Sequence, residues 1–268
     1  MIPVQSNEFG RAREKSVMTR ILAVANQKGG VGKTTTVINL GASLAVNDRE
    51  VLVIDMDPQA NATGGLGLSG FEGPGINELL LGKATIEEVA RSCDMDGLQL
   101  VPGSGDLAGL EIELASSEYR EFLLAEAIEN GLERFDYVLI DCPPSLGLLT
   151  INALVAATEV LVAMQSEYYA LEGLTRLLRT VKNVRSLWNP GLKLNGVLLT
   201  MFDGRLRLNR EVADEVEEHL GRALYRTKIP RNVKLSEAPS YGKPALLYDA
   251  RSTGAVSYLE LAGEVLKR

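Results

Sequence analysis

The stretch Gln27-Lys28-Gly29-Gly30-Val31-Gly32-Lys33-Thr34-Thr35 lies between an apolar run and a helical pattern. The run ILAVAN at 21–26 precedes it, and residues 34–46 follow as a helix candidate. Glycines allow the backbone to wrap closely around an anion with its N–H groups pointing inward. The free N–H groups and the positive dipole end of the following helix face the same anion. Strand, glycine loop and helix together predict a phosphate-binding loop in an α/β fold.

This loop follows the usual phosphate-loop pattern at its end and departs from it at its start. In the ending Gly32-Lys33-Thr34, the lysine neutralises the β- and γ-phosphates and the threonine hydroxyl binds Mg²⁺. The standard pattern also requires a glycine five positions before Gly32, where this chain has Gln27 followed by a second lysine, Lys28. The alternative is a glycine-rich turn with two surface lysines. The flanking strand and helix favour binding of ATP and Mg²⁺ by Lys28, Gly29, Gly30, Val31, Gly32, Lys33, Thr34 and Thr35.

Apolar runs and helical patterns alternate along the rest of the chain. We expect further strands at 51–55, 98–102, 136–141, 159–163 and 195–200, and further helices at 85–90, 120–131, 171–187, 208–220 and 255–267. The strand candidates are apolar throughout, which is typical of strands buried on both faces of a parallel sheet. The predicted fold class is therefore α/β, with a doubly wound, mostly parallel sheet and helices on both faces. We expect a flexible tail at 1–17, a loop at 64–75, and one domain at 18–268.

Composition excludes several classes of protein. The formal net charge is −7 and the sequence pI is about 5.0, which argues against a uniformly basic nucleic-acid coat but leaves room for a local basic patch. Cys93, Cys142 and His219 are the only cysteines and histidine, so no disulfide framework or zinc cluster is expected. The cysteine content suits a reducing cytoplasm. No run of 18 apolar residues predicts a membrane span.

Two strand candidates end in aspartate. Asp141 follows four apolar or aromatic residues directly, and Asp57 lies just beyond the strand candidate at 51–55. In a chain with a phosphate loop, a carboxylate at the end of an apolar strand is typical of one that orients Mg²⁺ or its waters. Asp57 is placed to reach the γ-phosphate and polarise the attacking water. The alternative is two turn carboxylates, since aspartate before proline is common in turns. We predict a magnesium site from Thr34, Asp57 and Asp141.

The chain resembles the ParA/Soj branch of the deviant-Walker ATPases, the chromosome and plasmid partition proteins. The resemblance covers about residues 18–268. It is carried by NQKGGVGKTTT at 26–36, VLVIDMDPQANAT at 51–63, DYVLIDCPPSLGLLTINAL at 136–154, EYYALEGL at 167–174, GVLLTMFDGR at 196–205 and IPRNVKLSEAPSYGKP at 229–244. It implies a slow ATPase that dimerises with ATP and is stimulated by DNA and by a ParB-type protein with a basic N-terminal segment.

The resemblance also implies a role for individual residues. Lys28 matches the signature lysine, which reaches across a nucleotide-sandwich dimer to the partner's ATP. Lys33 and Thr34 match the phosphate lysine and the magnesium ligand. Asp57 matches the residue that activates water, and Asp141 matches the aspartate that holds magnesium-bound waters. The catalytic set is then Lys28, Lys33 and Asp57. Adenine and ribose would be approached by the stretches 201–203 and 230–232, in particular by Met201, Pro230, Arg231 and Asn232.

A basic segment lies near the end of the chain. Residues 203–251 carry ten Lys/Arg and eight Asp/Glu, and five of those acids fall within 211–218. Phosphate contacts need only positioned cations, and they give salt-sensitive, sequence-independent binding. The alternative is an ordinary solvated surface. Members of the resembled family bind double-stranded DNA without sequence preference as ATP-bound dimers, in the cytoplasm and on the nucleoid. By that resemblance and by charge, the predicted DNA contacts are Arg205, Arg207, Arg231, Lys234 and Arg251.

Three other classes of protein share some of these features. A MinD-like membrane-associated ATPase would need a basic amphipathic tail, whereas 254–268 reads as a packing helix, so no membrane contact is expected. An iron-protein-type reductase would need two cysteines that bridge a cluster across a dimer, which Cys93 and Cys142 are poorly placed to do. A small-molecule ligase of the dethiobiotin-synthetase kind would show turnover of a carboxylate or amine and no stimulation by DNA.

Overall fold

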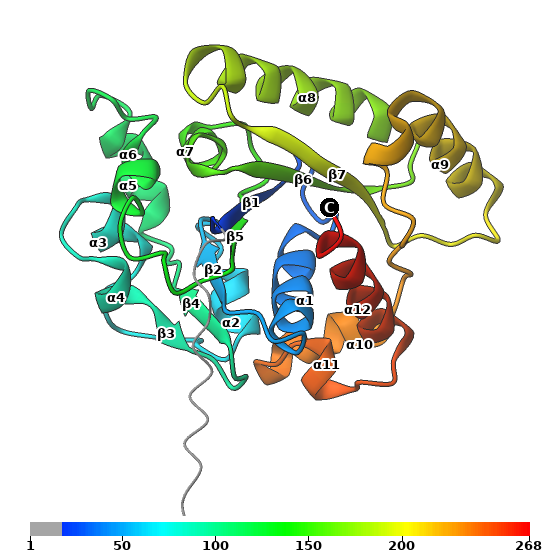
Figure 1. The fold of residues 1–268 in the computed structure, drawn as a ribbon, viewed down its shortest axis with the longest axis horizontal. Helices are drawn as coiled ribbons and strands as arrows, with labels where there is room; N and C mark the ends of the chain where they lie inside the picture. Colours follow the sequence, from blue (N-terminus) through cyan, green and yellow to red (C-terminus); the bar gives the residue numbers. More distant parts are fainter. Residues whose placement is uncertain (1–17) are drawn as a thin grey trace, which may run out of the picture.

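A single seven-stranded sheet forms the centre of the computed structural model, which describes residues 18–268 (Figure 1). The predicted tail at 1–17 lies outside the described residues. The strands of the sheet are β1 (Arg20–Ala25), β2 (Val51–Asp55), β3 (Arg91–Ser92), β4 (Leu98–Val101), β5 (Tyr137–Asp141), β6 (Glu159–Gln165) and β7 (Lys193–Thr200). Their spatial order is β3-β4-β2-β5-β1-β6-β7, and every neighbouring pair is parallel except β3–β4. The carboxyl ends of the parallel strands therefore share one edge of the sheet.

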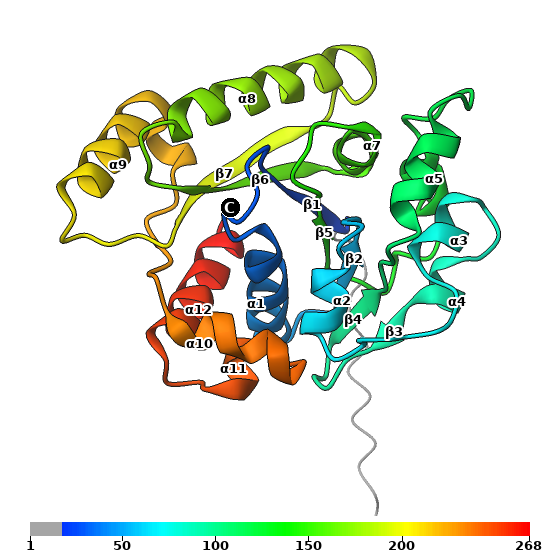
Figure 2. The ribbon, with the colours of Figure 1, turned by 180° about the vertical axis from the view of Figure 1, so that it is seen from behind.

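Helices cover both faces of the sheet, as Figures 1 and 2 show from opposite sides. One face carries α1 (Lys33–Ala45), α2 (Asn61–Gly65), α10 (Val233–Glu237), α11 (Ala245–Tyr248) and α12 (Thr253–Val265). The other carries α3 (Ile76–Leu80), α4 (Ile86–Val89), α5 (Leu107–Leu114), α6 (Leu123–Ala127), α7 (Leu148–Ala156), α8 (Ala170–Leu187) and α9 (Arg207–Leu220). The predicted doubly wound α/β class is confirmed.

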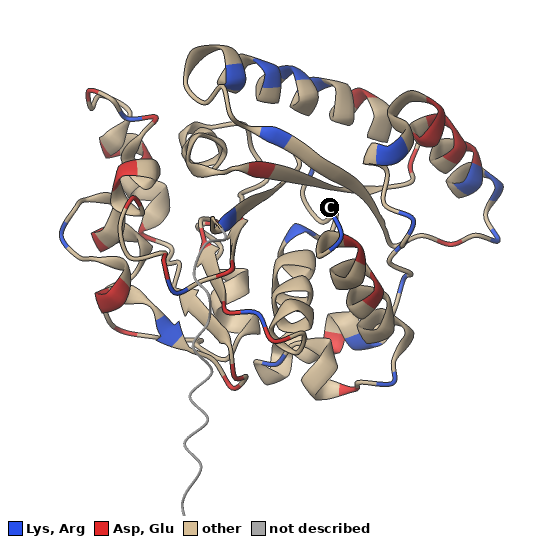
Figure 3. Cartoon of the chain, in the orientation of Figure 1, with Lys and Arg blue, Asp and Glu red and all other residues tan. Residues whose placement is uncertain are grey.

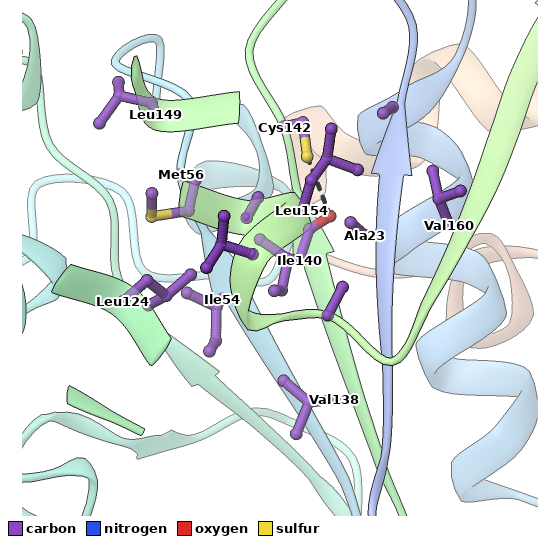
Figure 4. Close-up of a cluster of buried hydrophobic side chains, with 14 of the residues drawn as sticks. Ala23, Ile54, Met56, Leu124, Val138, Ile140, Cys142, Leu149, Leu154 and Val160 are labelled. Carbon is purple, nitrogen blue, oxygen red and sulfur yellow. Dashed lines mark hydrogen bonds between the residues drawn. The ribbon is translucent and has the colours of Figure 1, made fainter. Parts of the chain in front are cut away.

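The alternation of side chains along β2 and β5 builds two apolar cores. Ile54 and Ile140 point into the core on the α7 side together with Met56 and Cys142, the residues that follow the two strands (Figure 4). Successive side chains of a strand point to opposite faces, so the aspartates that end β2 and β5 point to the face that α1 covers. Cys142 is wholly buried in this apolar core, which raises the pKa of its thiol and leaves it a packing residue.

Several short elements differ from the predictions. α6 spans only Leu123–Ala127 within the predicted 120–131, because the regular helical backbone ends at Phe122 with φ −105° on one side and at Ile128 with φ −109° on the other. α7 was not predicted, because its sequence LLTINALVA is apolar on nearly all sides and shows no helical period. α2 includes the first two residues of the predicted loop at 64–75. β3 is a two-residue antiparallel strand that no pattern indicated.

Candidate functional site

The glycine loop joins β1 to α1 and has the backbone of an anion cradle. Gly30 and Gly32 have φ values of 71° and 86°, in the left-handed region that glycine enters without strain. Gly32 is the N-cap of α1, and its carbonyl accepts a hydrogen bond from Thr36 N at 2.9 Å. The N–H groups of the first helical turn therefore have no acceptor within the helix. They converge with the positive end of the helix dipole on the space above the loop.

Polar side chains at the ends of β6 and β7 fix the outer side of this loop. Thr200 Oγ1 donates to Val31 O at 2.7 Å, and Gln165 Nε2 donates to Gly30 O at 3.3 Å. Asn26, which follows β1, donates to the backbone of β6 and accepts from Lys28 N at 3.0 Å. None of these three side chains was predicted as a site residue. The available signal was a polar residue directly after each apolar strand run.

The two lysines of the loop have opposite environments. Lys33 is 6% exposed, and its Nζ donates to Lys28 O at 3.4 Å inside the cradle. Burial lowers the pKa of Lys33, while the negative charges of Asp141 and Asp57 oppose that shift. Lys28 is exposed and forms an ion pair with Glu167, which lies just after β6. One lysine is thus fixed within the cradle of its own chain, and the other lies outside it.

The two predicted carboxylates lie beside Lys33, at the ends of neighbouring strands. Asp141 is fully buried, and among residues 18–268 no donor makes a well-formed hydrogen bond to either of its oxygens, although the Thr34 side chain lies close enough to stabilise its charge. Burial raises the pKa of this carboxyl well above its ordinary value, the charge of Asp55 adds to the shift, and Thr34 and Lys33 oppose it. Asp57 is 7% exposed, and its Oδ1 accepts from Gln59 N at 3.0 Å. A buried carboxyl without well-formed hydrogen bonds is either neutral or carries its charge beside a cation or ordered water.

The donor set suits a hydrated magnesium ion. No group of three or more His, Cys, Asp or Glu side chains among residues 18–268 is arranged to enclose a metal. Magnesium is usually held by one or two carboxylates together with substrate phosphates and several waters. The Thr34 hydroxyl at the helix start and the buried oxygens of Asp141 provide these protein groups, with Asp57 nearby. The residues present therefore fit Mg²⁺ accompanied by a polyphosphate.

A cavity of about 450 Å³ opens beside the phosphate loop. It brings together Met201, Pro230, Arg231 and Asn232, the four residues predicted to approach adenine and ribose, with Thr34 and Thr35 of the loop. Met201 has a left-handed φ of 49°, an uncommon conformation for a non-glycine residue that often occurs at functional sites. Further lining residues that were not predicted come from α2, from α10 and the turn after it, and from α12: Asn61, Leu235, Ser236, Pro239 and Tyr258.

The five predicted DNA contacts lie on two parts of the chain. Arg205 and Arg207 flank the start of α9, whereas Arg231, Lys234 and Arg251 lie near α10 and before α12. Figure 3 shows Lys and Arg on these connecting segments and mostly Asp and Glu on α9. Three of the cations have acidic partners in the same chain: Arg205 with Asp203 at 2.7 Å, Arg207 with Glu211 at 2.6 Å, and Lys234 with Glu237 at 2.9 Å. The local surface is therefore less positive than its arginines and lysines alone would suggest.

A glycine loop after β1, with buried carboxylates after the neighbouring strands β5 and β2, defines a P-loop nucleotide-binding protein of the deviant type. A protein-family model described as an AAA domain matches residues 19–194. The chain is 49% identical over 262 residues to the chromosome partitioning protein ParA of Myxococcus xanthus, covering 97% of this chain and 93% of that one. It is 50% identical over 249 residues to the sporulation initiation inhibitor protein Soj of Bacillus subtilis, covering 92% and 98%. The chain belongs to the ParA/Soj family of partitioning ATPases, which confirms the resemblance.

A solved structure gives a similar result for the fold. Cobyrinic acid a,c-diamide synthase from Mycobacterium smegmatis, with bound ADP and magnesium, matches with a TM-score of 0.80 at 40% sequence identity. The match covers 93% of this chain and 95% of that one. The nucleotide class and the metal in that protein are those that the phosphate loop predicts here.

Proposed function

We propose that this protein is an ATPase that dimerises with ATP, binds DNA without sequence preference, and drives the segregation or positioning of chromosome or plasmid DNA together with a ParB-type partner. We place it in the cytoplasm, on the nucleoid. The observation that carries the proposal is the convergence of Lys33 and the buried Asp141 on the glycine loop, beside a cavity of about 450 Å³. The sequence identity of 49–50% to a ParA and a Soj protein supports the proposed role in DNA segregation.

Each residue at the loop has a separate role in phosphoryl transfer. Lys33 and the N–H groups of the first turn of α1 hold the β- and γ-phosphates. Thr34 and Asp141 would hold Mg²⁺ and its waters, and the bound ion would supply positive charge against the phosphate oxygens. Asp57 orients the attacking water and accepts a hydrogen bond from it. Because these groups sit on strand ends and a helix start, little reorganisation is needed when charge develops.

Dimerisation completes the site in this proposal. Lys28 is exposed at the edge of the cradle, and its ion pair with Glu167 lies between side chains that are both about half exposed. An exposed pair of this kind is worth roughly 0–1 kcal/mol, so Lys28 can exchange it for the phosphate of a second subunit at small cost. A cation added at the γ-phosphate is worth roughly 10³–10⁵ in rate. Hydrolysis therefore requires that two subunits pair, and once the ATP is hydrolysed the dimer separates.

The DNA part of the proposal uses Arg205, Arg207, Arg231, Lys234 and Arg251. The acidic partners do not prevent DNA binding, because phosphate oxygens can replace these partly or fully exposed carboxylates at the cations. Two subunits joined by ATP present two such surfaces to one duplex, and this multivalency raises avidity. The protein is thus expected to leave DNA when ATP is hydrolysed.

The alternative function, a MinD-like membrane-associated ATPase, can be tested separately. α12 buries Ala255, Tyr258, Leu261 and Val265, among others, against the α1 face of the sheet, so its apolar side is already covered. No helix among residues 18–268 is both long and apolar enough to cross a membrane. ATP-dependent flotation with anionic liposomes would favour that class over the partition class.

Light scattering with and without ATP, followed by co-sedimentation with DNA, tests the proposal. The Asp57→Ala protein is expected to form an ATP-dependent dimer that pellets with DNA at about 50 mM salt and much less at about 200 mM. The same protein remaining monomeric and free of DNA would contradict the scheme.

A pair of charge-reversal variants isolates the DNA surface. Arg205→Glu with Lys234→Glu should remove DNA binding and keep ATP-driven dimerisation. Lys182→Glu with Arg185→Glu is the matched control, because these exposed residues lie near the end of α8. A crossover helix runs back toward the amino ends of the strands, so this pair is on the edge opposite the site. Equal loss of DNA binding in both double variants would contradict the assignment of Arg205 and Lys234 to the DNA-binding surface.

A further inference from the structure

A third carboxylate, Asp55, ends β2 and has no role in the proposed chemistry. It is fully buried, and it pairs in register with Asp141 on β5. Unlike Asp141, Asp55 has well-formed hydrogen bonds at both oxygens. Its Oδ2 accepts from Thr63 N at 2.8 Å and from Thr63 Oγ1 at 2.7 Å, and its Oδ1 accepts from Asp57 N at 3.2 Å. One side chain therefore holds both ends of the segment 57–63.

That segment has a conformation that needs external support. Ala60 has a left-handed φ of 50°, which is unfavourable for a residue with a Cβ and persists only where the surroundings fix it. Ala60 is also the N-cap of α2, and it offers no side-chain oxygen to the first helical turn. Thr63 N belongs to that turn, and Asp55 from the neighbouring strand accepts its hydrogen bond instead. The carboxylate thus acts as a cap supplied from outside the helix.

A second loop closes over this arrangement. Gly103, just after β4, donates its N–H to Thr63 Oγ1 at 2.8 Å. A Cβ at Gly103 would lie 2.9 Å from both Cγ and O of Asp55, so no larger residue fits without displacing the carboxylate or its strand. The packing that requires a glycine here also keeps water from Asp55. Its hydrogen bonds are therefore made in a dry environment, where they are stronger than at the surface.

Two residues of the segment face the nucleotide site. Asp57 lies beside Lys33, and Asn61 lines the 450 Å³ cavity next to the phosphate loop. We propose that Asp55 is a positioning residue that fixes Asp57 at the γ-phosphate and Asn61 at the nucleoside by bridging Asp57 and Thr63. This inference rests on the proposed function of Asp57. It assigns no contact between Asp55 and the substrate.

Hydrogen–deuterium exchange of the nucleotide-free protein tests the bridge without any ATPase activity. In Asp55→Asn the amide cannot accept all three hydrogen bonds, so backbone exchange of residues 57–66 should become faster while β1 and β5 keep their protection. Thr63→Val, which removes only the hydroxyl, should have the same effect. So should Gly103→Ala, in which the added methyl group pushes Asp55 aside from the loop after β4. These two carry the test if Asp55→Asn does not fold.

Steady-state kinetics then tests the positioning. The three variants should lose about 10–100-fold in kcat, as is typical when a group that orients a reacting residue is removed, with a smaller change in ATP affinity. Thr158→Val is the matched control, since Thr158 also makes hydroxyl hydrogen bonds to backbone, at the opposite edge of the sheet. It should change neither kcat nor exchange at 57–66.

The outcomes separate the two proposals. Unchanged exchange at 57–66 in all folded variants overturns the bridge. Faster exchange with normal kcat overturns the positioning role, since the contacts would then be structural only. Unchanged exchange combined with weaker magnesium affinity would place Asp55 in the metal site instead and also overturn the inference. A wild-type protein without ATPase activity would refute the proposed function, while the exchange result would still decide the bridge.

Discussion

Replacing Gly32 with alanine perturbs the backbone of the phosphate cradle and little else. The φ of Gly32 is 86°, and an added Cβ would lie 3.6 Å from Thr200 Cγ2, an ordinary van der Waals contact. The space is adequate, so the penalty comes from the left-handed backbone and is roughly 1–2 kcal/mol. For a chain of this size, that corresponds to a fall in Tm of about 2–8 °C. Relaxation of the strain would turn loop N–H groups away from the phosphates.

The loss of binding can be bounded in the same way. A hydrogen bond to a charged group contributes about 1.5–3 kcal/mol, so each N–H that leaves the phosphate should weaken ADP·Mg²⁺ binding about 10–100-fold. Isothermal calorimetry and thermal melts measure the two effects. Gly263→Ala in α12 is the control: nothing lies within 4 Å of its added Cβ, and alanine is favoured there by about 0.5–1 kcal/mol. A Gly32→Ala protein with wild-type affinity and wild-type Tm would refute the cradle.

Three further outcomes are expected from the same site. Burial raises the pKa of Asp141, so ionising it costs stability in the nucleotide-free fold: the penalty is absent below the ordinary pKa of a carboxyl, grows as the pH rises toward the raised pKa and is complete above it. Asp141→Asn should therefore raise Tm in EDTA near pH 8 and by less near pH 5, and a lower Tm near pH 8 would contradict this. Lys33→Ala should show no calorimetric ATP binding and stay monomeric in light scattering with ATP; retained binding would remove Lys33 from the site. Thr200→Val leaves Val31 O without its donor, so Tm should fall by about 2–8 °C and nucleotide affinity should weaken, whereas an unchanged Kd would show that the loop needs no support from β7.

The parts of the fold that could be predicted are those with a strong local pattern. Strands β1, β2 and β5 are apolar on both faces, so their runs appear in sequence within a residue of where they lie. The glycine loop could be placed because only glycine enters the backbone conformations at positions 30 and 32 without strain. The short helices gave no such pattern. α7 is buried on nearly every side, and the five residues of α2 are too few to show a period.

The candidate site divides in the same way. Lys33, Asp57 and Asp141 were predictable because each follows directly from a strand or loop motif. The roles of Asp55 and Thr63 were not, because a carboxylate that accepts hydrogen bonds from a turn eight residues away is set by tertiary structure. The acidic partners of Arg205 and Arg207 were visible only as composition, and their pairing depends on where α9 begins.

The order of the strands determines which parts of the molecule can open locally. β2, β5 and β1 occupy the middle of the sheet, each bonded along both of its edges and covered on both faces. Exposing their amides requires opening nearly the whole domain. The segments that extend past their carboxyl ends are held mainly by side-chain hydrogen bonds, so they open at a lower free energy than the strands do. Nucleotide can therefore enter and leave repeatedly during the lifetime of one folded chain, while the strands that carry the reactive groups stay closed to solvent.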